Sequence, residues 1–417
     1  MTSAGADLAD VLREGDLVMV GCGAGEPTGL LRELVERRHD LPPVRLLLGY
    51  RLTDVVQPQH LDALDVVVLG GYGSNASLVA AGADVLPVRV ADLPGLVLDG
   101  PLRPDVVLLA CAPAGPDGRH SLGVTADVVG QACSVARAVV AEVRSAAPRT
   151  RGHPPLDPSQ VTAWTWCDEP LPELGRGSPG PVERAIAEHV AEQVPDGAVL
   201  QLGIGKVPDA VARALTGHRD LGLHSGFLGD WARELVERGV VTNARKPIDR
   251  GHTVGGVLMG TSALYAWADD NPDLEVRDVR HTHGADVLAR FESLVSVNSA
   301  IEVDLGGQVN AEWAGGRYVG AIGGHVDYVR AGALAPRGAG VVALPSTTRD
   351  GRTRIVPRLD DGVVTTARSD VDLVVTEHGV ARLRGVSLGE RARRLAAIAA
   401  PEHREGLARY THAAREA

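Results

Sequence analysis

Aromatic residues and lysines are scarce in this chain. Phe, Trp and Tyr together make up 3% of the 417 residues, and lysine occurs only at positions 206 and 246. A core with few aromatic rings must be filled by Val, Leu, Ala and Ile. This composition is typical of a soluble α/β protein.

The chain also lacks a long apolar segment. No uncharged apolar run reaches 18 residues, and no basic stretch followed by an apolar one opens the sequence, so we expect neither membrane insertion nor export. The four cysteines, at positions 22, 111, 133 and 167, have no Cys-x-x-Cys spacing and are too few for a disulfide scaffold. A reducing, cytoplasmic location fits these features best.

Blocks of positive charge are missing as well. The formal net charge is −11, and the 42 basic residues are interspersed with acidic ones. This distribution argues against a nucleic acid or an anionic membrane as partner. Any anionic ligand must therefore be bound by a few local groups.

Several familiar catalytic motifs are absent. The sequence has no G-x-S-x-G motif of serine hydrolases, no complete G-x-G-x-x-G and no P-loop. His281 and His283 form an H-x-H pair without a third spaced ligand, so we expect a solvated loop there and assign no metal.

Short apolar runs that alternate with amphipathic stretches dominate what is present. Examples are "DLVMVGCG", "VRLLLGY", "LDVVVLGGYG", "DVVLLACAP" and "ARAVVAEV". Such a pattern indicates buried parallel strands with helical crossovers. Proline and glycine are concentrated in residues 147–181, which we interpret as a linker without regular elements. We therefore divide the chain into α/β domains at 1–180 and 181–417.

The beginning of each half has the same glycine spacing. One constant offset of 182 residues relates two sets of glycines: Gly15, Gly21 and Gly23 in the first half, and Gly197, Gly203 and Gly205 in the second. Two related domains explain this spacing, although turns from a strand into a helix commonly contain glycines. The free N–H groups of such turns can face a phosphate or a carboxylate.

Two later segments combine strand-like or glycine-rich sequence with polar residues. "VSVNSAIEVDLGGQVNAE" (295–312) places polar groups within an apolar run, which predicts a hydrogen-bonded network, either functional or purely structural. "GAIGGHVDYVRAG" (320–332) has the composition of a loop that approaches a ligand closely, or of a tight turn.

These segments, with "LQLGIGKVPDAV", "GVVTNARK", "LMGTSALYAWADDNP" and "VVTEHGVARLRGVSLGERARRLAAIAAPEHRE", resemble the acetyl-CoA hydrolase/transferase family, in particular its 4-hydroxybutyrate CoA-transferase-like branch. The resemblance implies two related open α/β domains of the CoA-transferase type, with most of the acyl-CoA site in the C-terminal one. It also implies an enzyme in which a glutamate attacks the thioester, forming an acyl-glutamyl anhydride and then a glutamyl-CoA thioester.

The segment "LHSGFLGD" departs from this pattern. Where the family typically reads H-T-E, this chain reads His224-Ser225-Gly226, so the resemblance places Gly226 at the position of the nucleophilic glutamate. In an extended strand His224 shares a face with residue 226 and Ser225 points to the other face. His224 is therefore the preferred catalytic group, with Ser225 adjacent and Glu302 as a reserve carboxylate.

Other positions match the family. By resemblance, Asn298 helps to stabilise the thioester oxyanion. Substrate or CoA binding is assigned, besides Gly226, to the glycines and basic positions of the matching motifs: Gly203, Gly205, Lys246, Gly323, Gly324 and His325, the last standing where glutamine is common.

The sequence thus predicts an enzyme with an atypical active site that acts on an acyl thioester of CoA or of a carrier protein. Water or a small molecule is the expected acceptor, no tightly bound cofactor is expected, and a homo-oligomer is possible. Two alternatives are a conventional CoA-transferase that uses Glu302 and an acyl-CoA-binding protein that has lost catalysis.

Overall fold

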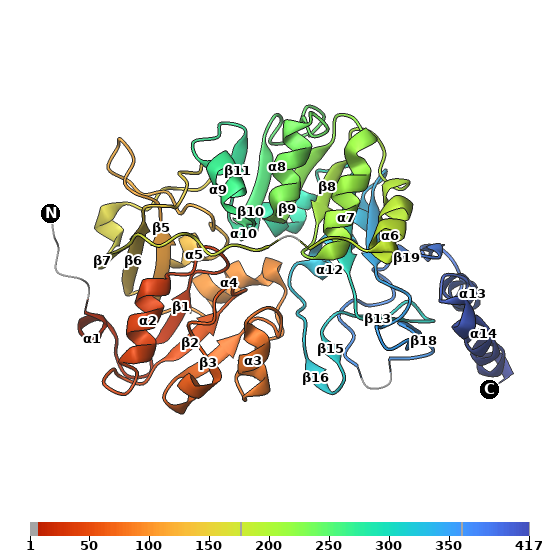
Figure 1. Cartoon of the computed structure of the whole chain (residues 1–417), viewed down its shortest axis with the longest axis horizontal. Helices are drawn as coiled ribbons and strands as arrows, with labels where there is room; N and C mark the ends of the chain where they lie inside the picture. The colour runs from red at the N-terminus through yellow and green to blue at the C-terminus, as the bar shows by residue number, and fades with distance from the viewer. Residues whose placement is uncertain (1–6, 176, 360–361, 417) are drawn as a thin grey trace. The chain divides into compact units, whose positions relative to one another are not determined.

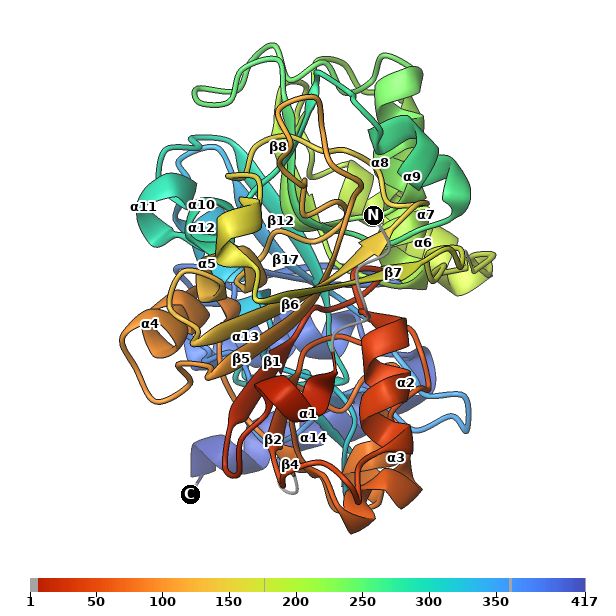
Figure 2. The ribbon, with the colours of Figure 1, turned by 90° about the vertical axis from the view of Figure 1, so that its left-hand side faces the viewer.

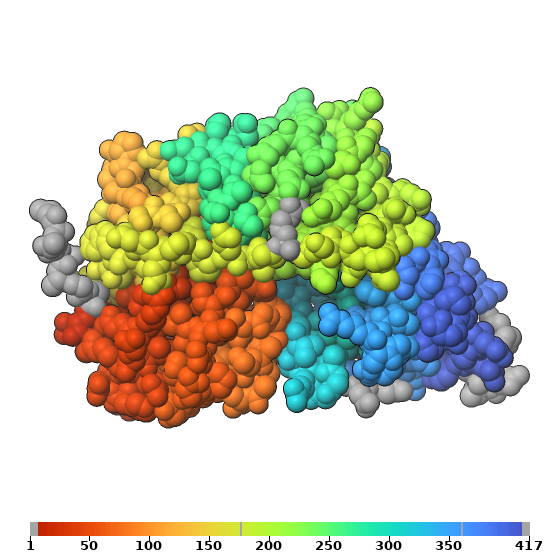
Figure 3. All heavy atoms as spheres, in the orientation of Figure 1, coloured from red at the N-terminus to blue at the C-terminus, as the bar shows by residue number. Residues whose placement is uncertain are grey.

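The structure, a computed structural model, describes residues 7–175, 177–359 and 362–416 (Figure 3). These residues form two compact units. The first contains the described residues up to Gly175 together with Gly226–Asp230 and His252–Gly284, and the second contains the remainder. The division into CoA-transferase-like domains at residues 1–180 and 181–417 stays a prediction.

A seven-stranded parallel sheet with the order β4-β3-β2-β1-β5-β6-β7 forms the centre of the first unit. Its strands are β1 (Leu17–Val20), β2 (Arg45–Leu48), β3 (Asp65–Val68), β4 (Asp84–Val85), β5 (Val106–Cys111), β6 (Ala138–Arg144) and β7 (Ala163–Cys167). The α-helices between Leu8 and Gly175 are α1 (Leu8–Val11), α2 (Thr28–Glu36), α3 (Asn75–Ala80), α4 (Leu93–Leu98) and α5 (Val129–Ala132), with short 3-10 turns at Pro58–Asp62, Val90–Asp92 and Pro158–Gln160.

Helices cover both faces of this sheet. Figure 2 shows α2 and α3 on one face and α4 and α5 on the other. Every residue of β5 and β6 is buried, as expected for parallel strands covered on both sides. The strands predicted here from the apolar runs of the sequence are confirmed.

The second sheet has eight strands in the order β11-β10-β9-β8-β12-β17-β19-β20. They are β8 (Val199–Leu202), β9 (Gly222–Leu228), β10 (Thr253–Leu258), β11 (Leu274–Val276), β12 (Leu294–Ser299), β17 (Ala339–Ala343), β19 (Leu373–Thr376) and β20 (Gly379–Arg382). β9 pairs with β8 through Gly222 and Leu223, and its last three residues belong to the first unit with β10 and β11. β20 is antiparallel to its neighbour β19.

Helices and short strands complete this part of the chain (Figure 1). The helices are α6 (Pro181–Ala191), α7 (Lys206–Ala214), α8 (Asp230–Glu237), α9 (Ser262–Ala268), α10 (Val279–His283), α11 (Ala285–Leu288), α12 (His325–Leu334), α13 (Leu388–Ala397) and α14 (Pro401–Glu416), with a 3-10 turn at Leu215–Gly217. Two small sheets contain β13 (Glu302–Asp304), β14 (Val309–Asn310), β15 (Trp313–Ala314), β16 (Arg317–Tyr318) and β18 (Ile355–Val356). Within the second unit, α12 packs on β12 and β17.

The two sheets repeat one topology. Reading from β4 to β7 and from β11 to β19 gives the same order of strands along the chain. The Gly21 N–H donates to the Leu108 carbonyl at 2.8 Å, and at an offset of 182 residues the Gly203 N–H donates to the Val297 carbonyl at 3.0 Å. The expectation of two related α/β folds, drawn from the glycine spacing, is confirmed.

One expectation about the linker is wrong. Residues 147–181 contain strand β7, which pairs in parallel with β6 along its whole length. The strand is the five-residue segment "AWTWC". The prolines and glycines on both sides of it led to the expectation of a linker, but hydrogen bonds with β6 stabilise the strand. Among the described residues, no helix combines the length and the apolar character needed to cross a membrane.

Candidate active site

Strand β9 carries the segment that departs from the family pattern. Its extended backbone alternates side chains between two faces, so residues 224 and 226 share one face and Ser225 points to the other. The Ser225 hydroxyl is fully buried and donates to the Leu202 carbonyl at 3.3 Å. This bond ties β9 to β8.

His224 lies in an enclosed position. The side chain has no exposed surface, and its ring centroid lies 4.7 Å from that of Phe291. Its Nδ1 atom is 3.8 Å from the nearest carboxylate oxygen of Asp249. That distance is too long for a direct hydrogen bond.

Side chains from the loop after α8 hold the first half of β9. The Asn243 side-chain oxygen accepts a hydrogen bond from the Leu223 N–H at 2.9 Å, and the Lys246 ammonium donates to the Leu223 carbonyl at the same distance. Lys246 is buried, and its stem lies against Gly222. The contact gives Lys246 a structural role here, and its predicted role in CoA binding stays a prediction.

Gly226 faces the imidazole of His283. A Cβ atom added at Gly226 would lie 2.6 Å from His283 Nε2 and still closer to Cε1, whereas real Cβ atoms essentially never approach another atom within 3.0 Å. His283 is 7% exposed and ends helix α10. The expectation of a solvated loop at His283 is therefore wrong, because α10 packs this side chain into the interior.

Asp230 fixes the turn after β10. One of its carboxylate oxygens accepts from the Thr261 N–H at 2.9 Å and the other from the Thr261 hydroxyl at 2.7 Å. Thr261 is the N-cap of α9. Asp230, which matches the family pattern, thus completes the start of that helix.

Asn298 pairs with a glutamine that the sequence did not single out. Its Nδ2 donates to Gln201 Oε1 at 2.9 Å, and Gln201 Nε2 donates to Asn298 Oδ1 at 3.2 Å. Both side chains are buried. Gly203 lies beside the pair, because a Cβ atom there would be 3.5 Å from Asn298 Oδ1.

The expected polar network after Asn298 is present. Asp304 accepts from the backbone of Gly306 and Gln308, and Glu312 accepts from the hydroxyls of Thr365 and Tyr318. These contacts satisfy buried groups and support a structural role for this part of the network.

Glu302 is a partly buried carboxylate at the start of β13. It interacts electrostatically with Arg354. Burial lowers the pKa of Arg354, and the charges of Glu302 and Glu377 offset only part of this effect. The side chain is thus available as a carboxylate near a cation.

The glycine-rich segment 320–324 leads directly into α12. Gly323 has φ +54°, a conformation that favours glycine, and Gly324 is the N-cap. His325 is the first residue of α12, and its Nδ1 lies 2.9 Å from the Thr366 hydroxyl oxygen. Burial lowers the pKa of His325 to about 4, and Nε2 has no hydrogen-bond partner within the described part of the chain.

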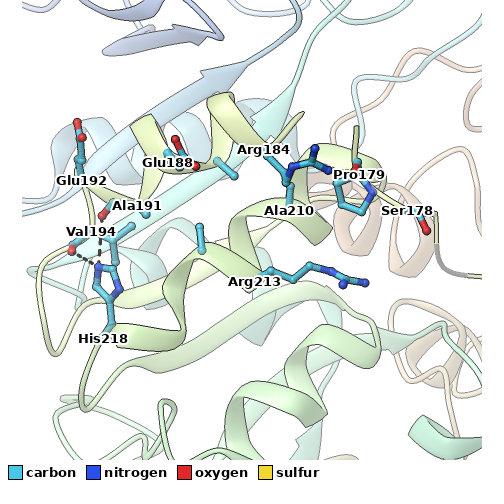
Figure 4. Close-up of a pocket in the computed structure, with 12 residues that line it drawn as sticks. Ser178, Pro179, Arg184, Glu188, Ala191, Glu192, Val194, Ala210, Arg213 and His218 are labelled. Atoms are coloured by element: carbon cyan, nitrogen blue, oxygen red, sulfur yellow. Dashed lines mark hydrogen bonds between the residues drawn. The ribbon is translucent and has the colours of Figure 1, made fainter. Parts of the chain in front are cut away.

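A separate pocket of about 790 Å³ lies between α6 and α7 (Figure 4). Towards one end Arg184 donates to the Pro179 carbonyl at 2.7 Å, and towards the other His218 Nε2 donates to the Val194 carbonyl at 3.0 Å. None of the site residues predicted from the sequence is among the residues that line this pocket.

The structure thus brings some of the predicted residues into local groups. Asn298 lies with Gly203, and Gly323 and Gly324 lead into His325. Gly226 belongs to the first unit and Asn298 and Gly324 to the second, so their convergence on one site stays a prediction.

Sequence reasoning missed Gln201, Asp249 and Thr366, and it placed His283 in a solvated loop. The available signal for the place of His283 was Gly226 itself, because a glycine within a strand often marks a close approach by another group.

Comparisons with known proteins agree with this architecture. Residues 260–411 match the acetyl-CoA hydrolase/transferase C-terminal domain. The chain is 40% identical over 396 residues to the 4-hydroxybutyrate coenzyme A transferase of Clostridium kluyveri, covering 94% of this chain and 92% of that one.

Solved structures give the same result. The crystal structure of RipA from Yersinia pestis superposes with a TM-score of 0.92 at 30% identity, covering 97% of this chain and 95% of the other. The 4-hydroxybutyrate CoA-transferase from Porphyromonas gingivalis gives a TM-score of 0.80 at 31% identity, with the same coverage of each chain. The chain belongs to the acetyl-CoA hydrolase/transferase family.

Proposed function

We propose that this protein cleaves an acyl thioester, of CoA or of a carrier-protein phosphopantetheine arm, without forming a glutamyl-CoA intermediate. The acyl group passes to water or to an acceptor other than a carboxylate. Membership of the family supports an acyl thioester as substrate, and the residues at position 226 and around it support the change in chemistry.

The observation that carries the proposal is the absence of a side chain at residue 226. The resemblance places the family's nucleophilic glutamate at this position, and covalent catalysis by that route requires a carboxylate. The neighbouring His283 ring occupies the space in which such a side chain would begin. A glutamyl anhydride therefore cannot form at residue 226.

Hydrolysis needs a base and donors to an oxyanion. An imidazole accepts a proton from water as the water oxygen attacks the thioester carbonyl, and His224 is the imidazole that the sequence favours. Asn298 Nδ2 and the backbone near Gly323 and Gly324 would donate to the oxyanion. When the C–S bond breaks, the proton passes to sulfur, giving the carboxylic acid and the free thiol.

The CoA moiety would be bound by groups assigned from the resemblance. They are Gly203, Gly205, Lys246, Gly323, Gly324 and His325. The buried Nε2 atom of His325, without a partner in the described residues, supports a ligand contact at the start of α12.

A second candidate is a conventional CoA-transferase in which Glu302 is the nucleophile. The partly buried position of this carboxylate, near Arg354, favours it over exposed acidic residues. A third is an acyl-CoA-binding protein without catalysis, in which the matching residues only maintain packing.

One experiment separates these candidates. The purified protein is incubated with a panel of acyl-CoAs, with and without acetate, while free thiol and product masses are followed. The proposal predicts thiol release that does not depend on acetate. Acetate-dependent formation of acetyl-CoA supports Glu302, and binding without turnover supports the third candidate.

A further inference from the structure

The imidazole of His283 takes the place of a side chain at Gly226. The edge formed by Cε1 and Nε2 faces Gly226, because Nδ1 lies 3.6 Å from the Cβ position while Nε2 lies 2.6 Å from it. Gly256 permits this arrangement from the neighbouring strand, since a Cβ atom there would lie 2.9 Å from the Gly226 carbonyl oxygen. Gly226 thus leaves the space that the ring fills, and Gly256 allows the backbone of residue 226 to lie close to the neighbouring strand.

Hydrogen bonds fix the orientation of this ring. His283 Nδ1 lies 2.9 Å from Thr282 Oγ1, and the Thr282 hydroxyl donates to the Asp278 carbonyl at 3.1 Å. With its proton used in this way, the Thr282 oxygen accepts from Nδ1–H. The proton on Nδ1 makes Nε2 the basic nitrogen, on the edge that faces Gly226.

We propose that His283 is the catalytic base of the thioester cleavage and replaces the carboxylate that is missing at residue 226. The inference rests on the proposed function and reassigns the base from His224 to His283. Nε2 accepts a proton from water as the water oxygen bonds to the thioester carbonyl carbon. The imidazolium then gives this proton to the CoA sulfur as the C–S bond breaks.

The position of His283 suits a base at residue 226 better than the position of His224 does. His224 has no exposed surface and packs on Phe291, whereas His283 lies directly against the backbone of residue 226. Burial lowers the pKa of His283 to about 3, so its ring is neutral at neutral pH. Such a weak base also predicts slow turnover, because general-base catalysis is most efficient when the pKa lies near the working pH.

The test compares three single variants of the full chain with wild type. His283→Asn can keep the hydrogen bond to Thr282 and lacks the basic Nε2, and His224→Asn removes the alternative base. His153→Asn is the matched control, since His153 is also buried in the first unit and its pKa is also lowered by burial. Acyl-CoA binding, steady-state thiol release and thermal unfolding are measured for each.

We expect His283→Asn to lower kcat by roughly 100-fold or more, the usual scale for a general base, with Kd for acyl-CoA changed by less than about threefold. His153→Asn should change kcat by less than about threefold. If His283→Asn fails to fold, His283→Gln, which places a non-basic amide near the position of Nε2, is measured against the same expectation.

Two results overturn the inference in different ways. A folded His283 variant with wild-type kcat, together with inactive His224→Asn, shows that His224 is the base and leaves the proposed function intact. A wild-type protein without turnover on any acyl thioester contradicts the proposed function and the role of His283 together.

Discussion

The side-chain amides of Gln201 and Asn298 are joined by two reciprocal hydrogen bonds, of 2.9 and 3.2 Å, between the neighbouring strands β8 and β12. This pairing couples the two amides, because turning either one alone would place nitrogen against nitrogen and oxygen against oxygen and would lose both bonds. One hydrogen of Asn298 Nδ2 is bound by Gln201, and the other can be directed to a ligand. We therefore predict that Gln201 positions the oxyanion donor that the proposed function assigns to Asn298.

Replacement of Gln201 tests this relationship. We expect Asn298→Ala to lower kcat by about 100-fold, as for loss of one oxyanion donor, and Gln201→Leu to lower it by about 10-fold with an unchanged Kd. The double variant should be no worse than Asn298→Ala, because the two residues act through one group. Gln59→Leu, at an exposed glutamine, is the control. Additive losses in the double variant would show that Gln201 acts independently.

Restoring a glutamate at residue 226 requires two changes. Gly226→Glu alone should form no CoA adduct, because its Cβ atom would collide with the buried His283 ring. Gly226→Glu combined with His283→Gly removes the collision, so this double variant should form a glutamyl-CoA adduct. Peptide mass mapping after incubation with acetyl-CoA locates the adduct.

A second double variant is the control for this rescue. Gly226→Glu combined with His153→Gly removes a different buried histidine and should still form no adduct. Equal adduct formation by Gly226→Glu with and without the His283 change would show that the ring moves aside readily and does not block the site.

His325 should make the protein sensitive to acid. Burial holds its folded-state pKa at about 4, below the value of 6.5 expected in the unfolded chain, so the unfolded state binds a proton first as the pH falls. The stability contribution is present above pH 6.5 and is lost as the pH falls towards 4. At pH 5 the loss is about 2 kcal/mol.

The measurement is the free energy of unfolding at pH 7.5 and pH 5 for wild type and for His325→Gln. The wild type should lose about 2 kcal/mol more than the variant, because glutamine does not titrate. His39→Gln changes an exposed histidine and should behave as wild type. The same pH dependence in wild type and His325→Gln would contradict the assignment.

The repeated fold could be predicted from the sequence because its signal is local. Glycines at a constant offset mark the turns after β1 and β8, and continuous apolar runs mark strands that are buried on both faces. Strand β7 was missed because the prolines and glycines on both sides of it dominate the local composition. Its hydrogen bonds come from β6, which no local pattern reveals.

The candidate site was predicted only in part, for a similar reason. The missing side chain at Gly226 can be read from the sequence, but the group that fills its place is 57 residues away along the chain. The polar segment "RHTHGAD" has the composition of a loop, and only the packing of α10 buries His283. Gln201 was not singled out, because nothing near it in the sequence indicates that its amide pairs with that of Asn298.

The central claim is that acyl thioesters are cleaved here without exchange of CoA between carboxylates. It is tested most directly by incubating the wild-type protein with propionyl-CoA and deuterated acetate and measuring deuterated acetyl-CoA and free CoA by mass spectrometry over time. We predict that free CoA and propionate accumulate while deuterated acetyl-CoA stays at the level of the enzyme-free control. Robust formation of deuterated acetyl-CoA, with a CoA adduct mapped to Glu302, would contradict the account.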